Sequence, residues 1–352
     1  MSFLNDLCKG MDNTIVLSEG GNSSEFSGSI DTGSYILNAV LSGSIYGGVP
    51  NNKITAFEGE SATGKTFFVL GVLKTFLDQN PKGGVIYFDT EAAVTKRMMT
   101  DRGIDVSRVV ISEPQSIEEF RTNAVKMLDK YNEGDEKPPM MMVLDSLGML
   151  SSEKELADTA DGKNTRDMTK AQLLRGTFRV LSLKLAKANV PMLVTNHVYD
   201  VVGAYVPTKE ISGGSGLKYA ASSICMLTKK KDKDGTDVIG NIIKVRMHKS
   251  RFTKENKGVE VRLSFDKGLD RYYGLLELAE KYEVIKKVST RYELPDGSKV
   301  FGKNINEDPE KYFTPDVLAQ LDECAKKEFL YGQVEIQDDS EVPTDGTSEL
   351  VS

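Results

Sequence analysis

Residues 59–66 form a glycine-rich run with the spacing of a phosphate-binding loop. They match the pattern G-x-x-x-x-G-K-[ST] without a mismatch, between an apolar strand-like segment at 53–58 and an apolar helix-like segment at 67–73. The backbone N–H groups of such a loop form an anion-binding concavity, and the following helix adds the positive end of its dipole. The alternative is a simple glycine turn between a strand and a helix. The run consists of Gly59, Glu60, Ser61, Ala62, Thr63, Gly64, Lys65 and Thr66.

Two side chains of this run and one later acid would act directly on a nucleoside triphosphate and its metal ion. Lys65 would reach the β- and γ-phosphates, and the Thr66 hydroxyl would bind Mg²⁺. Asp145 ends the apolar run at 140–144, where a second carboxylate would hold the water shell of the Mg²⁺ ion. The alternative for Asp145 is an ordinary turn or helix-capping aspartate.

Polar side chains also follow two other apolar strand-like segments. Asp89 and Glu91 have the spacing i, i+2, so they point to the same side of an extended chain. One of them would orient and deprotonate the attacking water, because phosphoryl transfer depends on positioning. The alternative is two solvated loop acids. Asn196 and His197 end a later strand, where a side chain would hydrogen-bond the γ-phosphate and report its loss; the alternative for His197 is a buried, hydrogen-bonded imidazole.

The elements that must position these residues alternate between residues 35 and 265. Near-continuous apolar strands separated by helical patterns are typical of a parallel sheet that is covered on both faces. Ligands of such sheets bind at the carboxyl ends of the strands. After Ser222 the pattern becomes strand, turn, strand, with Asp234 and Gly235 at the predicted hairpin turn. We therefore expect an α/β fold with a mostly parallel central sheet.

Two long polar segments, at about 148–167 and 199–216, follow predicted site strands and are read as loops. Loops of this length are usually functional or disordered, and basic and aromatic side chains on them suit a nucleic-acid strand. The candidate DNA-binding residues are Lys154, Lys163 and Arg166 in the first loop, and Tyr205, Lys209, Gly213 and Gly214 in the second.

A basic strand and turn follow the predicted hairpin. They are either a solvated charged surface or a set of cations aimed at a phosphate. The basic residues are Lys244, Arg246, Lys249, Arg251, Lys254 and Lys257.

Composition limits the partners and the compartment. The net charge is −7, but residues 335–352 contain six acids and no base, so the rest of the chain carries −1 and has room for a local basic surface. No run of 18 apolar residues occurs, and the first residues lack the pattern of a signal peptide. The three cysteines suggest neither a disulfide framework nor a metal site, which fits a reducing cytoplasm. Near the N-terminus, residues 14–17 are either a strand that joins the sheet of another protomer or part of a disordered arm.

In combination these motifs resemble the RecA-type recombinases, and most closely the UvsX recombinases of T-even phages. The ordered matches cover roughly residues 30–300, so the resemblance is specific. The family's adenine-stacking tyrosine falls on Met98, which is a departure, and bacterial RecA has glutamine where His197 stands. The matching segments are 31–34, 41–43, 47–50, 59–66, 87–91, 144–147, 196–197, 212–214, 217–219 and 249–251.

The resemblance implies a role for each candidate residue. Glu91 would be the catalytic base, His197 would sense the γ-phosphate, and Lys249 and Arg251 would reach the ATP of a neighbouring subunit. It implies ATP and Mg²⁺ as cofactors. It also implies single- and double-stranded DNA as partners, self-association into helical filaments, and single-strand-binding and loader proteins.

We therefore predict an ATP-dependent recombination protein that forms filaments on single-stranded DNA and catalyses homologous pairing and strand exchange in a bacterial or phage-infected cell. Two alternatives are a recombinase paralogue that acts as a mediator and a ring-forming RecA-fold DNA motor. The expected domains are an N-terminal oligomerisation arm and linker (1–34), a RecA-like ATPase core (35–270), a small α+β C-terminal domain (271–333) and an acidic disordered tail (334–352).

Overall fold

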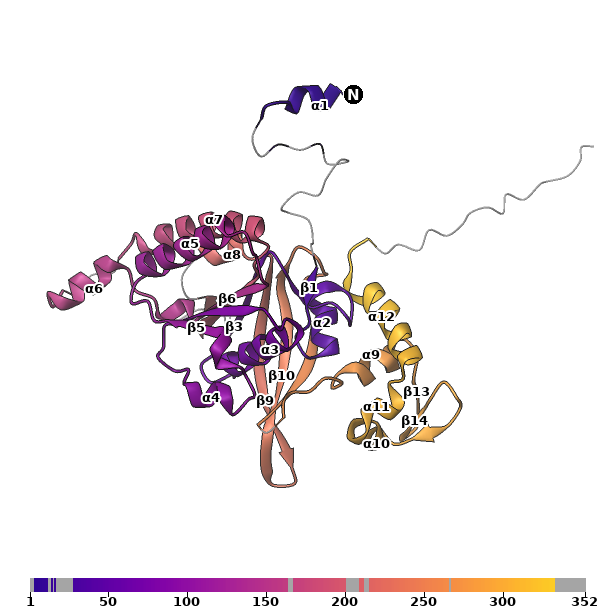
Figure 1. Cartoon of the computed structure of the whole chain (residues 1–352). Coiled ribbons are helices and arrows are strands. Elements are labelled where there is room, and N and C mark those ends of the chain that lie inside the picture. The colour runs from indigo at the N-terminus through magenta and orange to yellow at the C-terminus, as the bar shows by residue number, and fades with distance from the viewer. Residues whose placement is uncertain are drawn as a thin grey trace, which may run out of the picture.

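A ten-stranded sheet lies at the centre of the part of the chain that the computed structural model describes (Figure 1). Six neighbouring strands, from β9 to β5, run parallel, and β10, β11 and β12 extend the sheet in antiparallel pairing. The strand order is β12 (Gly268–Leu269), β11 (Gly258–Ser264), β10 (Asp237–Ser250), β9 (Ser223–Asp234), β3 (Ile54–Gly59), β7 (Met192–Asp200), β6 (Met140–Asp145), β4 (Gly84–Asp89) and β5 (Val109–Ser112), and β8 (Lys209–Ile211) pairs with β7. The described residues are 3–11, 14, 16, 28–163, 167–200, 209–211, 215–265 and 267–332.

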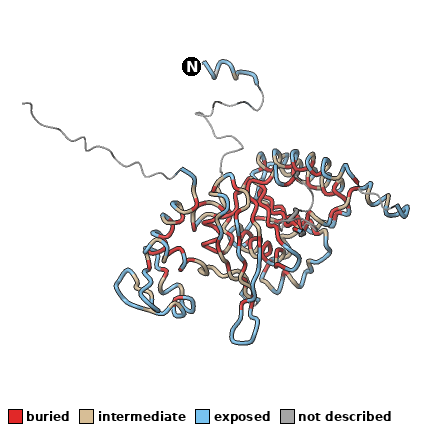
Figure 2. Tube along the Cα trace, turned by 180° about the vertical axis from the view of Figure 1, so that it is seen from behind, coloured by how far each residue is buried: buried red, intermediate tan, exposed pale blue. Residues whose placement is uncertain are grey.

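The burial of the strands explains this arrangement. β3 is buried along its whole length and β6 along all but its first residue, as expected of strands with helices on both faces. β9 and β10 instead run out into an exposed hairpin, which projects from the body of the molecule in Figure 2. Its turn contains Gly235 at φ 60°, so the predicted hairpin is confirmed.

Helices cover both faces of the sheet, and each face has its own apolar cluster. On one face Phe57 of β3 meets Phe68 of α3 edge to face, with ring centroids 5.0 Å apart. On the other face Phe88 of β4 meets Phe120 of α5 in the same way, also at 5.0 Å. The predicted α/β fold is therefore confirmed. The first face holds α2 (Tyr35–Ser42) and α3 (Lys65–Gln79), and the second holds α5 (Ile117–Glu133), α7 (Lys170–Ala188) and α8 (Ser215–Ala220).

The C-terminal elements pack against α2 rather than standing apart. Leu321 and Phe329 share one apolar cluster with α2. The buried Asp322 Oδ1 accepts hydrogen bonds from the Ser44 hydroxyl at 2.6 Å and the Ile45 N–H at 2.9 Å. The domain boundary at residue 271 stays a prediction. These elements are α9 (Leu275–Lys281), β13 (Lys286–Val288), β14 (Arg291–Glu293), β15 (Lys299–Val300), α10 (Gly302–Glu307), α11 (Pro309–Tyr312) and α12 (Pro315–Phe329).

The segment predicted as the first DNA-binding loop contains a helix, so it is a loop only in part. The reason is local: Glu155 N–H donates to the Ser152 hydroxyl at 3.1 Å, and Ser152 N–H donates to Glu155 Oε2 at 3.2 Å, which is a capping box. The helix, α6, spans Glu153–Ala160. The remaining elements are α1 (Phe3–Cys8), β1 (Ser29–Ile30), β2 (Val49–Pro50), α4 (Lys96–Thr100) and two 3₁₀ turns at Val106–Arg108 and Leu147–Met149.

Several predicted features fall wholly or partly outside the described residues. They are the N-terminal arm and linker at 1–34 with its strand at 14–17, the first loop at 164–166, the second loop at 201–208 and 212–214, and the acidic tail at 334–352. Within the described ranges, every helix is too short or too polar to cross a membrane.

Candidate nucleotide site

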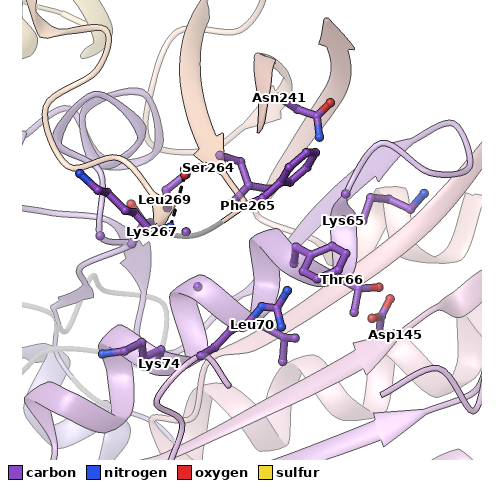
Figure 3. A pocket seen from close by; sticks show the side chains of 18 of the residues that line it. Lys65, Thr66, Leu70, Lys74, Asp145, Asn241, Ser264, Phe265, Lys267 and Leu269 are labelled. Atoms are coloured by element: carbon purple, nitrogen blue, oxygen red, sulfur yellow. Dashed lines mark hydrogen bonds between the residues drawn. The ribbon is translucent and has the colours of Figure 1, made fainter. Parts of the chain in front are cut away.

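A cavity of about 780 Å³ lies beside the N-terminus of α3, at the carboxyl ends of the parallel strands. Figure 3 shows Lys65, Thr66 and Asp145 along one side of it, and Asn241 and Phe265 on the other. Asn241 comes from β10, and Phe265 directly follows β11. The cavity is therefore lined on one side by the predicted phosphate-binding loop and on the other by the Phe265 ring and the Asn241 amide, which come from the antiparallel part of the sheet.

The loop between β3 and α3 places Lys65 at the N-terminus of α3, the positive end of the helix dipole. β3 ends at Gly59, and α3 begins at Lys65 after Gly64, whose φ of 90° favours glycine. Lys65 Nζ donates to the carbonyls of Gly59 at 3.0 Å and Glu60 at 2.9 Å. Burial lowers the pKa of Lys65, while the carboxylates of Glu91 and Asp145 act to raise it. Lys65 thus lies at the N-terminus of α3, where the helix dipole and backbone N–H groups favour an anion.

Lys65, His197 and Glu91 form a connected chain across the site. Lys65 Nζ lies 3.4 Å from His197 Nδ1, and His197 Nε2 lies 2.9 Å from Glu91 Oε1. Because a lysine ammonium only donates, Nδ1 is the acceptor and Nε2 carries the proton that reaches Glu91. The Ser146 hydroxyl donates to the same Glu91 oxygen at 2.6 Å. Burial acts to raise the pKa of Glu91, but the hydrogen bonds from His197 and Ser146 outweigh it and lower that pKa.

The neighbouring acid Asp89 has a different task. It is buried, and its carboxylate accepts the backbone N–H groups of Glu91 at 3.1 Å, Ala93 at 3.4 Å and Val94 at 2.9 Å. Its oxygens are thus committed to shaping the turn after β4. Of the two acids at this strand end, Glu91 is the one that lines the cavity, which favours it as the base.

Asp145 is held in a fixed orientation at the end of β6. The Tyr87 hydroxyl donates to its Oδ2 at 2.7 Å, and the Thr195 hydroxyl donates to its Oδ1. Thr66 and Asp145 both line the cavity. In the described part of the chain no group of three acidic, histidine or cysteine side chains forms a metal site. This donor set fits Mg²⁺, which takes one or two protein oxygens and completes its shell with phosphates and water.

Lys249 and Arg251 do not line the cavity that contains Lys65. Lys249 Nζ donates to the carbonyls of Lys218 at 2.6 Å and Ala221 at 2.7 Å, at the end of α8. Arg251 Nη2 reaches the Tyr219 carbonyl at 3.5 Å. Their charges cap the carboxyl end of α8, the helix that follows the second predicted DNA-binding loop.

The predicted DNA-binding residues are only partly described. Lys154 Nζ lies 3.8 Å from Asp167 Oδ1, and Lys163 Nζ lies 2.9 Å from Asp161 Oδ2. Hydrogen bonds from Ser152 and Thr169 lower the pKa of Asp167 to about 2, so this end of the first loop is fixed by an ionised carboxylate. The backbone of Lys209, in β8, pairs with that of Asp200, in β7. Arg166, Tyr205, Gly213 and Gly214 lie outside the described residues.

The sequence analysis assigned no role to five residues of the site: Tyr87, Ser146, Thr195, Asn241 and Phe265. Ser146 follows Asp145 directly, and Tyr87 precedes Asp89 by two positions, so their closeness to predicted site residues was a usable signal. Phe265 carried none, since it reaches the cavity only because β11 packs beside β10. Met98, where the related family has an aromatic residue, packs against the apolar cluster and does not line the cavity.

A family model described as the RecA N-terminal domain matches residues 3–270. The chain belongs to the RecA family. It is similar to the recombination and repair protein of Enterobacteria phage T4, with 31% identity over 244 residues, which span 69% of this chain and 61% of the phage protein. It is also similar to Protein RecA of Malacoplasma penetrans, with 26% identity over 78% of this chain and 80% of that protein. With Protein RecA of Fusobacterium nucleatum it shares 27% identity over 94% of this chain and 84% of that protein.

Membership of the RecA family confirms the resemblance drawn from the ordered motifs. The matched range includes residues 59–66, Glu91, Asp145 and His197. It ends near Asp270, before α9, so it leaves the C-terminal elements unassigned.

Proposed function

We propose that this RecA-family protein is a DNA-dependent ATPase that assembles into helical filaments on single-stranded DNA and catalyses homologous pairing and strand exchange. The observation that carries the proposal is the chain from Lys65 through His197 to Glu91. It links a phosphate-binding loop to a strand that leads directly into the second predicted DNA-binding loop. The family match and the name of the phage T4 relative, a recombination and repair protein, support the same activity.

The proposed substrate is ATP. The N–H groups of residues 59–66 and Lys65 would hold the phosphates, and Thr66 and Asp145 would hold Mg²⁺. The bound ion would supply positive charge to offset the charge that develops on the phosphate oxygens. Glu91 orients the attacking water and accepts its proton; its lowered pKa keeps it ionised at neutral pH. Phe265 and Asn241 line the far side of the cavity, where they would contact the nucleobase.

Coupling to DNA begins at His197. In the ATP-bound state His197 would hydrogen-bond the γ-phosphate, and it would lose that partner when the phosphate leaves. The strand continues from His197 through Tyr199, whose ring stacks on the imidazole with centroids 6.4 Å apart, into an antiparallel pair with β8. The segment between β7 and β8 includes Tyr205, a predicted DNA-binding residue. The pair β7–β8 would therefore couple the state of the nucleotide to the conformation of this loop.

Lys249 and Arg251 complete the site of the adjacent protomer in this proposal. Their absence from the cavity of their own protomer supports this assignment. A head-to-tail contact of this kind generates an open helix unless it closes into a ring. The proposed partners are single- and double-stranded DNA, further copies of the chain, and single-strand-binding and loader proteins, in the cytoplasm of a bacterial or phage-infected cell.

A mixture of two inactive variants tests the shared site. Lys65→Ala lacks the phosphate cation, and the double variant Lys249→Ala/Arg251→Ala lacks the cations that act on the neighbour. A cation at the developing γ-phosphate charge can be worth about 10³-fold or more in rate. Mixed filaments contain one junction type with an intact loop and intact cations, so DNA-stimulated ATP hydrolysis should partly return. No recovery in mixtures that demonstrably co-assemble would reject the trans assignment.

Electron microscopy distinguishes the alternative functions. With single-stranded DNA and a non-hydrolysable ATP analogue, the proposal predicts helical filaments. Closed rings would point to a RecA-fold motor, and isolated particles would point to a mediator; either result would reject the filament-forming recombinase.

A further inference from the structure

The turn that follows β10 carries one of the two proposed trans cations and is fastened to the end of α12. The Lys254 N–H donates to the Phe329 carbonyl at 2.7 Å. Lys254 Nζ donates to the Lys327 carbonyl at 2.9 Å. Tyr331 contributes a third contact, since its hydroxyl accepts the Glu255 N–H at 3.2 Å. The C-terminal helix thus holds the turn by backbone and side-chain contacts together.

Contacts inside the turn transmit this constraint to the cations. The Ser250 hydroxyl accepts the N–H groups of Phe252 at 3.1 Å and Thr253 at 2.9 Å, and the Ser250 N–H donates to Glu255 Oε1 at 3.3 Å. Thr253 also forms an isolated antiparallel bridge with Leu330. Ser250 stands between Lys249 and Arg251 in the chain. A shift of the turn relative to α12 therefore moves both cations.

Glu328 is the charged residue that ties this end of α12 to the rest of the protein. Its side chain is only 11% exposed. It accepts hydrogen bonds from Lys257 at 2.8 Å, Lys281 at 2.6 Å and the Tyr282 hydroxyl at 2.8 Å. Burial alone would raise the pKa of Glu328, but these donors lower it to about 2, so the carboxylate is ionised throughout the neutral range. Lys257 lies at the C-terminal end of the same turn, so its ion pair with Glu328 fixes that end of the turn to α12.

We propose that Glu328 is a positioning residue for ATP hydrolysis, which sets where Lys249 and Arg251 present their charges to the next protomer. This inference rests on the proposed trans role of these two cations. Cations that stabilise a transition state must be held within about 0.5 Å of the productive geometry, and the turn has no other charged anchor of this burial in the described structure. Loss of Glu328 should therefore lower the rate of hydrolysis at the neighbouring site and leave its own phosphate-binding loop intact.

The test places Glu328→Gln on one side or the other of the mixed filament described above. In the first mixture the change is added to Lys65→Ala, the protomer that donates the cations. In the second it is added to Lys249→Ala/Arg251→Ala, the protomer that donates the phosphate-binding loop. A misplacement of about 1 Å can cost up to about 10²-fold in rate, so we expect the recovered kcat to fall about tenfold or more in the first mixture. In the second mixture kcat should stay within about twofold of the parent mixture, and KM for ATP should change in neither.

Two further variants keep the test decisive. Tyr331→Phe removes only the hydroxyl that accepts the Glu255 N–H; because Tyr331 is 54% exposed, this change spares the fold and should show the same side dependence in weaker form. Glu323→Gln is the matched control, since this side chain lies on the same helix, is 67% exposed and pairs only with Lys326 among the described residues.

The outcomes separate this inference from the proposed function. Equal losses in both placements would show that Glu328 only stabilises the fold, and no loss in either would show that the turn does not need it; both overturn the proposal while leaving the trans cations in place. A parent mixture that recovers no hydrolysis would instead refute the trans assignment, and the inference with it.

Discussion

Replacing Glu58 with glutamine should remove a loss of stability that ionisation of this carboxylate causes above pH 5. Glu58 lies one residue before the phosphate-binding loop and is 1% exposed. No donor in the described residues meets strict hydrogen-bond geometry at either of its oxygens. Burial raises the pKa of Glu58 to about 7, although the Asn196 side chain on the adjoining strand and the charge of Lys218 act to lower it.

The magnitude follows from the difference between the folded and unfolded states. An ordinary glutamate has a pKa of 4.5, so the folded protein holds this proton about 2.5 pH units longer than the unfolded chain. Between these two values the folded state binds more protons, and its stability falls as the pH rises. The loss approaches about 3 kcal/mol at pH 8 and is below about 1 kcal/mol at pH 5.

Urea unfolding followed by circular dichroism measures this difference. We expect the free energy of unfolding of Glu58→Gln to exceed that of the wild type by about 2–3 kcal/mol more at pH 8 than at pH 5. All other titrating groups are shared, so their contributions cancel in the comparison. Glu113→Gln, at an exposed glutamate, is the matched control and should leave the pH dependence unchanged. Parallel pH profiles for the wild type and Glu58→Gln would refute the reasoning.

Two other changes test the site and the tail. Glu91→Gln keeps the shape of the side chain and removes the base, so hydrolysis should fall by about 10²-fold or more while ATP binding, measured by fluorescence titration, persists; unchanged turnover would mean that another group is the base. Truncation after Gly332 removes the six acids of the tail, so affinity for single-stranded DNA should rise, most at low salt. An identical salt titration for the truncated chain would show that the tail does not compete with DNA.

The sequence predicted the site residues best where they lie at or just after the carboxyl ends of apolar strands. Gly59 and Asp145 end apolar strands and Glu91 follows one, and parallel strands bring such residues to one edge of a sheet. Their closeness could therefore be predicted without knowing the strand order. The prediction that His197 ends its strand was wrong, because β7 continues to Asp200 by pairing with β8; His197 instead lies where the parallel pairing of β7 with β3 ends. Ser152 and Glu155 have the Ser-x-x-Glu spacing of a capping box, so the start of α6 was predictable, although the polar composition around them is typical of a loop.

Residues whose roles depend on contacts between distant elements could not be predicted. Phe265 reaches the cavity through the packing of β10 and β11, and Glu328 reaches Lys257 only because α12 returns to the core. The burial of Glu58 depends on strands on both sides of β3, and nothing in its local pattern distinguishes it from an exposed strand-end acid. The sequence showed that Lys249 belongs to a basic segment, but it did not predict that the side chain binds the carbonyls at the end of α8.

The most direct test of the central claim is the formation of joint molecules between circular single-stranded DNA and homologous linear duplex. With ATP and Mg²⁺, the wild-type protein should convert these substrates to joint molecules, and Lys65→Ala should form none because the phosphates lose their cationic side-chain partner. Heterologous duplex is the matched DNA control. A protein that binds DNA and hydrolyses ATP, yet forms no joint molecules on homologous DNA, would contradict the account.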